Sequence, residues 1–319
     1  MAAPLGFVVG STASGKSDLA VAAALACAKN GCPVEIISAD SVQIYRELVI
    51  GSARPSEQDL SSVRHHLIGH VSVADEYTAA DFAREAAAII ARSPETPFLV
   101  VGGSGFYVQA LMRGLYPIEK ANPVVRSELE GRAQTEGLEA LYRELQVKDA
   151  ETAAKIARQD RYRIIRALEI QASLPNGETL SQIRREFEAS SKAHLSRLFP
   201  GRAVATFGLR IDRERLVGRA RLRAESMVRE GLLAETYALR AYWSRPVLQS
   251  VGYRETIEHL RGEIPLSELV PAIVSSTLRL AKKQRTWFGR DDATQWFDAL
   301  TEREQAVQNL VAFAGAREA

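Results

Sequence analysis

Residues 10–17 read Gly-Ser-Thr-Ala-Ser-Gly-Lys-Ser and match the phosphate-loop pattern G-x-x-x-x-G-K-[ST]. An apolar run precedes this segment, and an alanine-rich stretch typical of a helix follows it. In that context backbone N–H groups point at phosphate oxygens, Lys16 supplies a positive charge, and Ser17 supplies a hydroxyl ligand for Mg²⁺. We therefore predict a site for a diphosphate or triphosphate. Its residues are Gly10, Ser11, Thr12, Ala13, Ser14, Gly15, Lys16 and Ser17.

Short apolar runs recur along the chain and alternate with stretches of helical pattern. They lie at residues 5–9, 34–37, 98–101 and 204–211. This alternation predicts an α/β fold with a P-loop NTPase-like parallel sheet at its core.

Residues 118–195 contain no strand-like run and are rich in Glu, Arg, Ala and Leu at helical spacing. Pro117 and Pro123 mark the start of this segment, Leu174-Pro175-Asn176-Gly177 breaks its helices, and Pro200-Gly201 follows it. We expect a P-loop α/β core formed by residues 1–116 and 196–319, and an all-helical insertion domain formed by residues 117–195.

The composition narrows the class of protein. Of 319 residues, 46% are hydrophobic and 25% are charged, which suits a folded soluble chain. No apolar run is long enough to span a bilayer and the N-terminus lacks a signal-peptide pattern, so we expect a cytoplasmic protein with no membrane contact. With only Cys27 and Cys32, neither a disulfide framework nor a cysteine zinc site is supported.

The net charge of +2 conceals an uneven distribution of charge along the chain. Residues 196–319 carry 20 Lys and Arg against 15 Asp and Glu. This basic C-terminal third hints at a large polyanionic partner, although a solvated charged surface is the commoner explanation of such an excess.

Asp40 follows an apolar run and is expected at the carboxyl edge of the sheet, facing the phosphate loop. Its carboxylate could hold Mg²⁺, accept a proton from a substrate, or cap a following helix. The apolar run that ends at Val101 is followed by Gly102-Gly103-Ser104-Gly105, so the acidic residue of an NTP hydrolase is missing there. This weakens the ATPase hypothesis, and the glycines suggest room for a bulky group near the phosphates.

Arg215, Arg219 and Arg223 lie one helical turn apart on one face of a predicted helix. Asp212 can pair with Arg215, whereas neither of the other two has an acidic residue three or four positions away. A bound anion would explain them, because guanidinium groups bind phosphate bidentately. A solvated arginine face is an equally good explanation.

Two further basic clusters contain an aromatic residue, which suits a nucleic-acid backbone together with a stacked base. They are Arg158, Arg161, Arg163 and Arg166 with Tyr162, and Arg279, Lys282, Lys283 and Arg285 before Trp287. His65, His66 and His70 could indicate a metal, but a histidine pair without a third ligand is more often part of ordinary packing.

Taken together, these residues resemble the tRNA dimethylallyltransferase family, also called tRNA isopentenyltransferase. The family's D-S-x-Q-x-Y segment is present as residues 40–45, and further matching motifs follow in the same order. They are residues 51–55, 65–68, 77–82, 101–107, 163–169, 251–253 and 281–284, with Thr286-Trp287. Three departures are Ser11 for the usual Pro, Gly69 for a common Asp, and Leu278-Arg279 for an Arg-Gln pair.

The resemblance implies transfer of a dimethylallyl group from dimethylallyl diphosphate to N6 of the adenine 3′-adjacent to the anticodon in tRNA. It implies that Thr12, Lys16, Arg219 and Arg223 act on the diphosphate with Mg²⁺, which Ser17 holds, and that Asp40 accepts the N6 proton. The insertion would bind the anticodon stem. The positions implied to contact tRNA are Asp40, Ser41, Val42, Gln43, Ser104, Arg126, Tyr162, Arg163, Ile164, Ile165, Arg166, Lys282 and Lys283.

Three alternatives stay open at this point. An adenylate isopentenyltransferase would act on a free nucleotide, a small-molecule P-loop kinase would turn over ATP, and an RNA-binding module would have kept an inactive phosphate loop. The basic clusters and the long insertion favour the tRNA enzyme, for which we expect a monomer.

Overall fold

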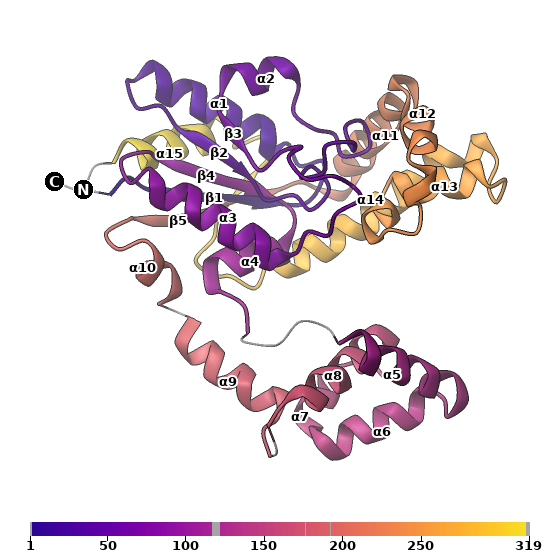
Figure 1. Cartoon of the computed structure of the whole chain (residues 1–319). Coiled ribbons are helices and arrows are strands. Elements are labelled where there is room, and N and C mark those ends of the chain that lie inside the picture. Colours follow the sequence, from indigo (N-terminus) through magenta and orange to yellow (C-terminus); the bar gives the residue numbers. More distant parts are fainter. Residues whose placement is uncertain (1, 117–121, 176, 192, 317–319) are drawn as a thin grey trace. The chain divides into compact units, whose positions relative to one another are not determined.

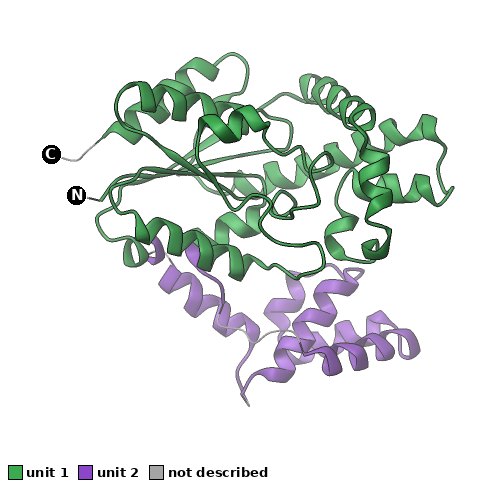
Figure 2. Cartoon of the chain, turned by 45° about the horizontal axis from the view of Figure 1, so that its top comes forward, with its two compact units in different colours: residues 1–112, 196–319 green, residues 113–195 purple. Residues whose placement is uncertain are grey.

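The computed structural model describes residues 2–116, 122–175, 177–191 and 193–316. The chain divides into two units: residues 1–112 with 196–319 form unit 1, and residues 113–195 form unit 2 (Figure 2). The predicted start of the insertion, at residue 117, lies outside the described residues. The division falls at Arg113, because α4 (Gly105–Arg113) ends there.

Unit 1 is built on a parallel sheet with strand order β3-β2-β4-β1-β5-β6 (Figure 1). The strands are β1 (Leu5–Gly10), β2 (Glu35–Ser38), β3 (His65–His66), β4 (Phe98–Gly102), β5 (Val204–Arg210) and β6 (Gln295–Asp298). In β1, Leu5 pairs with Phe98 on one side and with Val204 on the other. Both β1 and β4 are buried throughout, as expected for central strands covered by helices on both faces.

The predicted α/β fold is confirmed. The sequence pattern missed the edge strands β3 and β6, which have two and four residues and carry polar side chains. Such short, mixed segments lack the apolar run by which the inner strands were predicted.

Helices cover both faces of the sheet (Figure 1). Val8 of β1 and Leu99 of β4 pack with α1 and α15 in one core cluster, and the alternate residues Phe7 and Val100 point to the opposite face. The helices of unit 1 are α1 (Lys16–Lys29), α2 (Glu57–Ser62), α3 (Ala79–Arg92), α4, α11 (Arg213–Glu230), α12 (Leu232–Ala238), η1 (Arg240–Tyr242), η2 (Pro246–Gln249), α13 (Tyr253–Leu260), α14 (Leu266–Phe288) and α15 (Arg303–Gly315).

Unit 2 consists of helices joined by turns, with no strand among its described residues. It contains α5 (Pro123–Thr135), α6 (Leu138–Lys148), α7 (Ala150–Ala154), α8 (Arg161–Ser173) and α9 (Leu180–Ser191), and α10 (His194–Leu198) spans its end. Its own core includes Leu129, Leu141 and Leu168. The predicted break between helices lies between α8 and α9, although Asn176 is outside the described residues.

None of the helices in the described part of the chain combines the length and the hydrophobicity needed to cross a lipid bilayer.

Candidate active site

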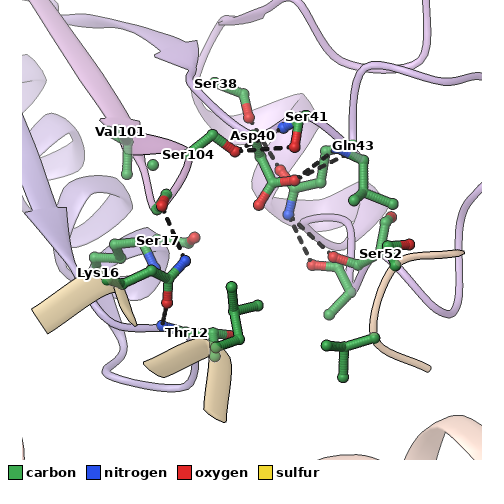
Figure 3. Close-up of a pocket in the computed structure, with 18 of the residues that line it drawn as sticks. Thr12, Lys16, Ser17, Ser38, Asp40, Ser41, Gln43, Ser52, Val101 and Ser104 are labelled. Atoms are coloured by element: carbon green, nitrogen blue, oxygen red, sulfur yellow. Dashed lines mark hydrogen bonds between the residues drawn. The ribbon is translucent and has the colours of Figure 1, made fainter. Parts of the chain in front are cut away.

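A cavity of about 700 Å³ lies at the carboxyl end of the sheet in unit 1. This edge is where ligands bind in open α/β folds. The phosphate loop lines one side of the cavity and the Asp40–Gln43 segment lines the opposite side (Figure 3). Residues that follow β4 and side chains of α11 and α14 complete the wall. The predicted phosphate site and the predicted carboxylate therefore share one enclosure.

The phosphate loop has the backbone of an anion cradle. Gly15, which precedes α1, adopts the left-handed conformation with φ of 90°, and Ala13 adopts it with φ of 60°. A residue other than glycine is strained in that conformation and keeps it only where the surrounding structure imposes it. The hydroxyl of Ser14 is buried and has no hydrogen-bond partner among the described residues. An oxyanion in the loop would give this hydroxyl an acceptor.

Three cations surround the loop. Lys16 Nζ donates a hydrogen bond to the carbonyl of Ser11 at 3.0 Å. Arg223 approaches Thr12 Oγ1 at 3.4 Å, and Arg219 lies so close to Gly15 that a Cβ there would stand 3.1 Å from its Nη2. Within the described part of the chain, neither Arg219 nor Arg223 forms an ion pair with a carboxylate. Two of the three arginines predicted on one helix face therefore lie at the loop, whereas Arg215 pairs with Asp212 at 3.3 Å.

Burial makes the positive charges of Lys16 and Arg223 costly in the absence of a bound anion. Desolvation lowers the pKa of Lys16 to about 8, opposed by the charge of Asp40, and desolvation likewise lowers the pKa of Arg223. A bound anion would raise the pKa of both groups again and offset the cost of their burial, so it would bind here with favourable electrostatics. A diphosphate carries the charge and the acceptor oxygens that this set of donors needs.

Asp40 directs one of its two oxygens inward to the backbone. Its Oδ1 accepts hydrogen bonds from the N–H groups of Val42 at 2.9 Å and Gln43 at 3.3 Å. The residues that follow form a turn and not a helix, so the helix cap, one of the three roles considered, is excluded and the carboxylate caps this turn instead. Among the described residues no hydrogen bond reaches Oδ2. One carboxylate oxygen therefore holds the side chain in place and the other is available in the cavity.

The neighbours of Asp40 are fixed by side-chain hydrogen bonds (Figure 3). Ser41 N donates to Ser104 Oγ at 2.9 Å, which ties this segment to the residues after β4. Gln43 is buried: its Oε1 accepts from Ser38 and its Nε2 donates to the carbonyls of Ser52 and Ala53. Its amide is fully used inside the protein, so Gln43 supports the site rather than presenting free donors.

The expected room is present at the glycines that follow Val101, because Gly102, the last residue of β4, and Gly103 line the cavity. A side chain at either position would nevertheless meet other parts of the chain. A Cβ at Gly102 would lie 2.0 Å from the carbonyl oxygen of Ala39, and one at Gly103 would lie 2.4 Å from Gln284 Nε2. Gln284 accepts a hydrogen bond from Thr12 N at 2.7 Å and donates one to Gly103 O at 2.9 Å.

Sequence reasoning gave Gln284 no role, although it binds the phosphate loop to the loop after β4. Its partner Thr12 is 272 residues away, so no local pattern could have revealed the contact.

The oxygen donors in the cavity suit a magnesium ion. Ser17 and Asp40 both line it, and hydroxyl and carboxylate oxygens are ligands that Mg²⁺ prefers. Throughout the described ranges, no cluster of three or more His, Cys, Asp or Glu side chains could hold a metal. This donor set fits a cation that takes most of its ligands from substrate phosphates and water.

The predicted contact residues of unit 2 fall into two groups. Tyr162 is 63% exposed, with the guanidinium of Arg126 5.3 Å from its ring centre. Arg163 is exposed and pairs with Asp160 at 2.6 Å, and Arg166 pairs with buried Glu169 at 2.9 Å. These side chains form a basic surface with an aromatic ring.

Ile164 and Ile165 of the same helix are only 0% and 2% exposed and lie in the core of unit 2. A contact of their side chains with RNA is therefore wrong: they are placed inward by the helical period that puts Tyr162 and Arg163 outward.

On α14 of unit 1, Lys282 and Lys283 are exposed, and Lys283 lines the cavity. Each of the three histidines has its own carboxylate or backbone oxygen as a partner, and among the described residues they do not form a common metal site. His66 lies 2.6 Å from Glu35, His70 lies 2.9 Å from Glu85, and His65 contacts a backbone carbonyl.

Comparison with known proteins identifies relatives over nearly the whole chain. The family model described as IPP transferase matches residues 43–291. The tRNA dimethylallyltransferase of Bdellovibrio bacteriovorus is 42% identical, over 92% of this chain and 93% of that protein. The tRNA dimethylallyltransferase 2 of Geotalea uraniireducens is 40% identical, over 91% of each.

Solved structures agree with this result. A full-length tRNA isopentenylpyrophosphate transferase from Bacillus halodurans superposes with a TM-score of 0.66 at 29% identity, covering 98% of this chain and 96% of that one. A eukaryotic dimethylallyltransferase acting on tRNA gives a TM-score of 0.77 at 22% identity, over 97% and 78% of the two chains, and shares the fold.

Proposed function

The chain belongs to the IPP transferase family, and from this membership we propose that it is a cytoplasmic tRNA dimethylallyltransferase. It transfers a dimethylallyl group from dimethylallyl diphosphate to N6 of the adenine 3′-adjacent to the anticodon and releases diphosphate. One observation carries the proposal: desolvated cations around a phosphate loop face a carboxylate with one free oxygen across the same cavity.

The cations act on the leaving group. As the allylic C–O bond breaks, negative charge develops on the bridging oxygen of the diphosphate. Lys16 and Arg223 supply positive charge there, in surroundings with little water, where electrostatic stabilisation is strong. We propose that Thr12 Oγ1, which Arg223 approaches, donates to the bridging oxygen and that Arg219, which lies against Gly15, closes over the diphosphate.

Magnesium is part of this proposal. The Ser17 hydroxyl would hold Mg²⁺ together with oxygens of the diphosphate. When bound, the cation neutralises charge on the leaving diphosphate.

Asp40 acts on the nucleophile. The lone pair of adenine N6 is delocalised into the ring, so N6 attacks well only if its proton is removed as the new N–C bond forms. Asp40 Oδ2 accepts this proton, while the hydrogen bonds of Val42 and Gln43 to Oδ1 fix the direction of the carboxylate. The electron pair of the broken C–O bond leaves with the diphosphate.

The RNA reaches the cavity with its target base turned out of the anticodon stack. We propose that Arg126, Tyr162, Arg163 and Arg166 of unit 2 bind the anticodon stem, and that Lys282 and Lys283 of unit 1 bind the strand near the cavity. Ser41 and Ser104 would contact the base beside Asp40. All the described residues that line the cavity belong to unit 1, so we expect a monomer to be active.

The test is transfer of labelled dimethylallyl groups to an anticodon stem-loop RNA and, in parallel, to AMP. Label in the RNA that depends on the target adenine supports the proposal. Label in AMP alone would instead identify an adenylate isopentenyltransferase, and ATP turnover without prenyl donor would identify a kinase.

A further inference from the structure

Two large aromatic side chains on the wall of the cavity are exposed. Phe106 is 55% exposed and Trp287 is 40% exposed, and both line the cavity. The burial of aromatic rings is strongly favourable, so a folded chain that leaves two of them in solvent beside a ligand cavity gives up stability that a ligand can restore.

The two residues come from different elements that meet at Gly105. Phe106 is the second residue of α4, and Trp287 lies near the end of α14. A Cβ at Gly105 would stand 2.4 Å from Trp287 Cδ1 and 2.5 Å from its Nε1. The indole edge is thus anchored against the backbone next to Phe106, which restricts its motion without burying the ring.

Positive charge accompanies these rings. Lys283 precedes Trp287 by one helical turn and lines the same cavity, and Lys282 is exposed beside it. A cation one turn from an exposed ring matches the alternation of phosphate and base along a single strand of nucleic acid. The dimethylallyl group carries no charge, and its diphosphate is assigned to the cations at the phosphate loop, so the two lysines are left for a different anion.

We propose that Phe106 and Trp287 are a stacking platform for the bases that flank the target adenine. This inference rests on the proposed RNA substrate. When the adenine leaves the anticodon stack, its two neighbours lose a stacking partner. The rings of Phe106 and Trp287 replace that partner, and Lys283 binds the phosphate between the bases. The platform thus stabilises the RNA conformation in which the adenine reaches Asp40.

The first test measures binding of an anticodon stem-loop RNA without prenyl donor. Phe106→Leu and Trp287→Leu remain apolar but lose the aromatic face, and each should weaken binding by about 5-fold to 150-fold, the effect of one lost base stack. Phe106→Tyr should bind within about threefold of the parent protein, because it keeps the ring. Tyr237→Leu is the matched control, since Tyr237 is 55% exposed in the same unit but does not line the cavity.

The second test locates the contact. 5-Bromouridine, placed in turn on each side of the target adenine, forms a photochemical crosslink with an aromatic ring on which it stacks. Mass spectrometry should place the crosslinks on Phe106 or Trp287, and the corresponding leucine variant should lose them. The proposal would be overturned if the leucine variants bound RNA as tightly as the parent protein, or if the crosslinks persisted in these variants. A higher KM for dimethylallyl diphosphate with unchanged RNA binding would also overturn it.

Neither test needs the transfer reaction, so the two proposals fail separately. Wild-type protein that binds and crosslinks RNA through these rings but transfers no label would contradict the proposed function and leave the platform standing. If the wild-type protein transfers label normally and the leucine variants bind RNA as it does, the platform is contradicted and the proposed function stands.

Discussion

The carboxylate of Glu235 accepts a hydrogen bond from the buried hydroxyl of Tyr253 at 2.6 Å. The same carboxylate accepts hydrogen bonds from the backbone N–H groups of Val49, Ile50 and Gly51. Gly51 has no space for a side chain, because a Cβ there would lie 2.4 Å from the ring of Tyr253. Glu235 of α12 and Tyr253 of α13 therefore fix residues 49–51. The next residue is Ser52, and its carbonyl oxygen accepts hydrogen bonds from Gln43 and Arg223.

This relationship predicts the effect of Tyr253→Phe. Burial, together with Glu235, raises the pKa of Tyr253 well above its usual value, so its hydroxyl stays a donor at any physiological pH. Removing it deletes one hydrogen bond to a charged group and should lower the free energy of unfolding by about 1.5–3 kcal/mol in urea denaturation. Tyr237→Phe, at an exposed ring, should change it by less than about 0.5 kcal/mol. Equal stability of the two variants would contradict the role of the pair.

Gly102 and Gly103 should respond differently to alanine. At Gly102 the new Cβ meets the backbone of Ala39, which cannot move away, so Gly102→Ala should fail to fold or lose several kcal/mol of stability. At Gly103 its one close contact is the end of the Gln284 side chain, which can rotate, and the carbonyl of Gly10 lies at an ordinary contact distance of 3.5 Å. Gly103→Ala should keep its melting temperature within a few degrees and bind dimethylallyl diphosphate more weakly, since Thr12 loses its partner. Calorimetry of both variants checks this, and a Gly103→Ala protein that binds diphosphate normally would argue against Gln284.

The phosphate loop and the central strands were predictable because they depend on local patterns. A fixed motif after an apolar run specifies Gly10 to Ser17, and the inner strands are continuous apolar runs. Asp40 followed from its place after a strand. These features need only neighbouring residues, and the structure brings them to one edge of the sheet.

Other parts of the site depend on contacts between distant segments. Gln284 reaches Thr12 across 272 positions, and Glu235 reaches Val49 across 186. Nothing in the sequence distinguishes Gln284 or Glu235 from other polar residues on helices. The burial of Ile164 and Ile165, by contrast, could have been found, because apolar residues at helical spacing indicate a core face. We nevertheless predicted tRNA contacts at both positions, because they lie in the family motif at residues 163–169.

Lys16→Ala should separate catalysis from RNA binding. Loss of one charge that acts on the leaving group should lower turnover by ~10²- to 10³-fold, with unchanged affinity for the stem-loop. The same residue predicts a pH dependence. Its pKa of about 8 means that the free enzyme loses this charge as the pH rises above that value, so kcat/KM for dimethylallyl diphosphate should fall there. A profile with the same break in Lys16→Ala would exclude Lys16 as its source.

Arg163 and Arg166 should differ when each is replaced by alanine. Arg163 is exposed, so Arg163→Ala should raise the KM for tRNA and reduce the slope of log affinity against log salt by about one, with no loss of stability. Arg166→Ala should in addition destabilise unit 2, because it leaves the buried carboxylate of Glu169 without its cation. Salt titrations and thermal melts of both variants measure this. An unchanged salt slope in Arg163→Ala would count against RNA binding by this surface.

Asp40→Asn separates the three roles considered for this carboxylate. Asparagine keeps an oxygen that can accept from Val42 and Gln43, so the turn should persist and the melting temperature should change little. If Asp40 is the proton acceptor, the chemical step should slow by ~10²- to 10⁴-fold with normal affinity for dimethylallyl diphosphate, because the amide cannot take a proton. A metal ligand would instead show weaker diphosphate binding and a higher magnesium requirement. Single-turnover rates at several magnesium concentrations distinguish these outcomes, and we expect the first, since Oδ2 faces the cavity with no protein partner among the described residues. A rate within a few-fold of that of the parent protein would mean that Asp40 only stabilises the turn.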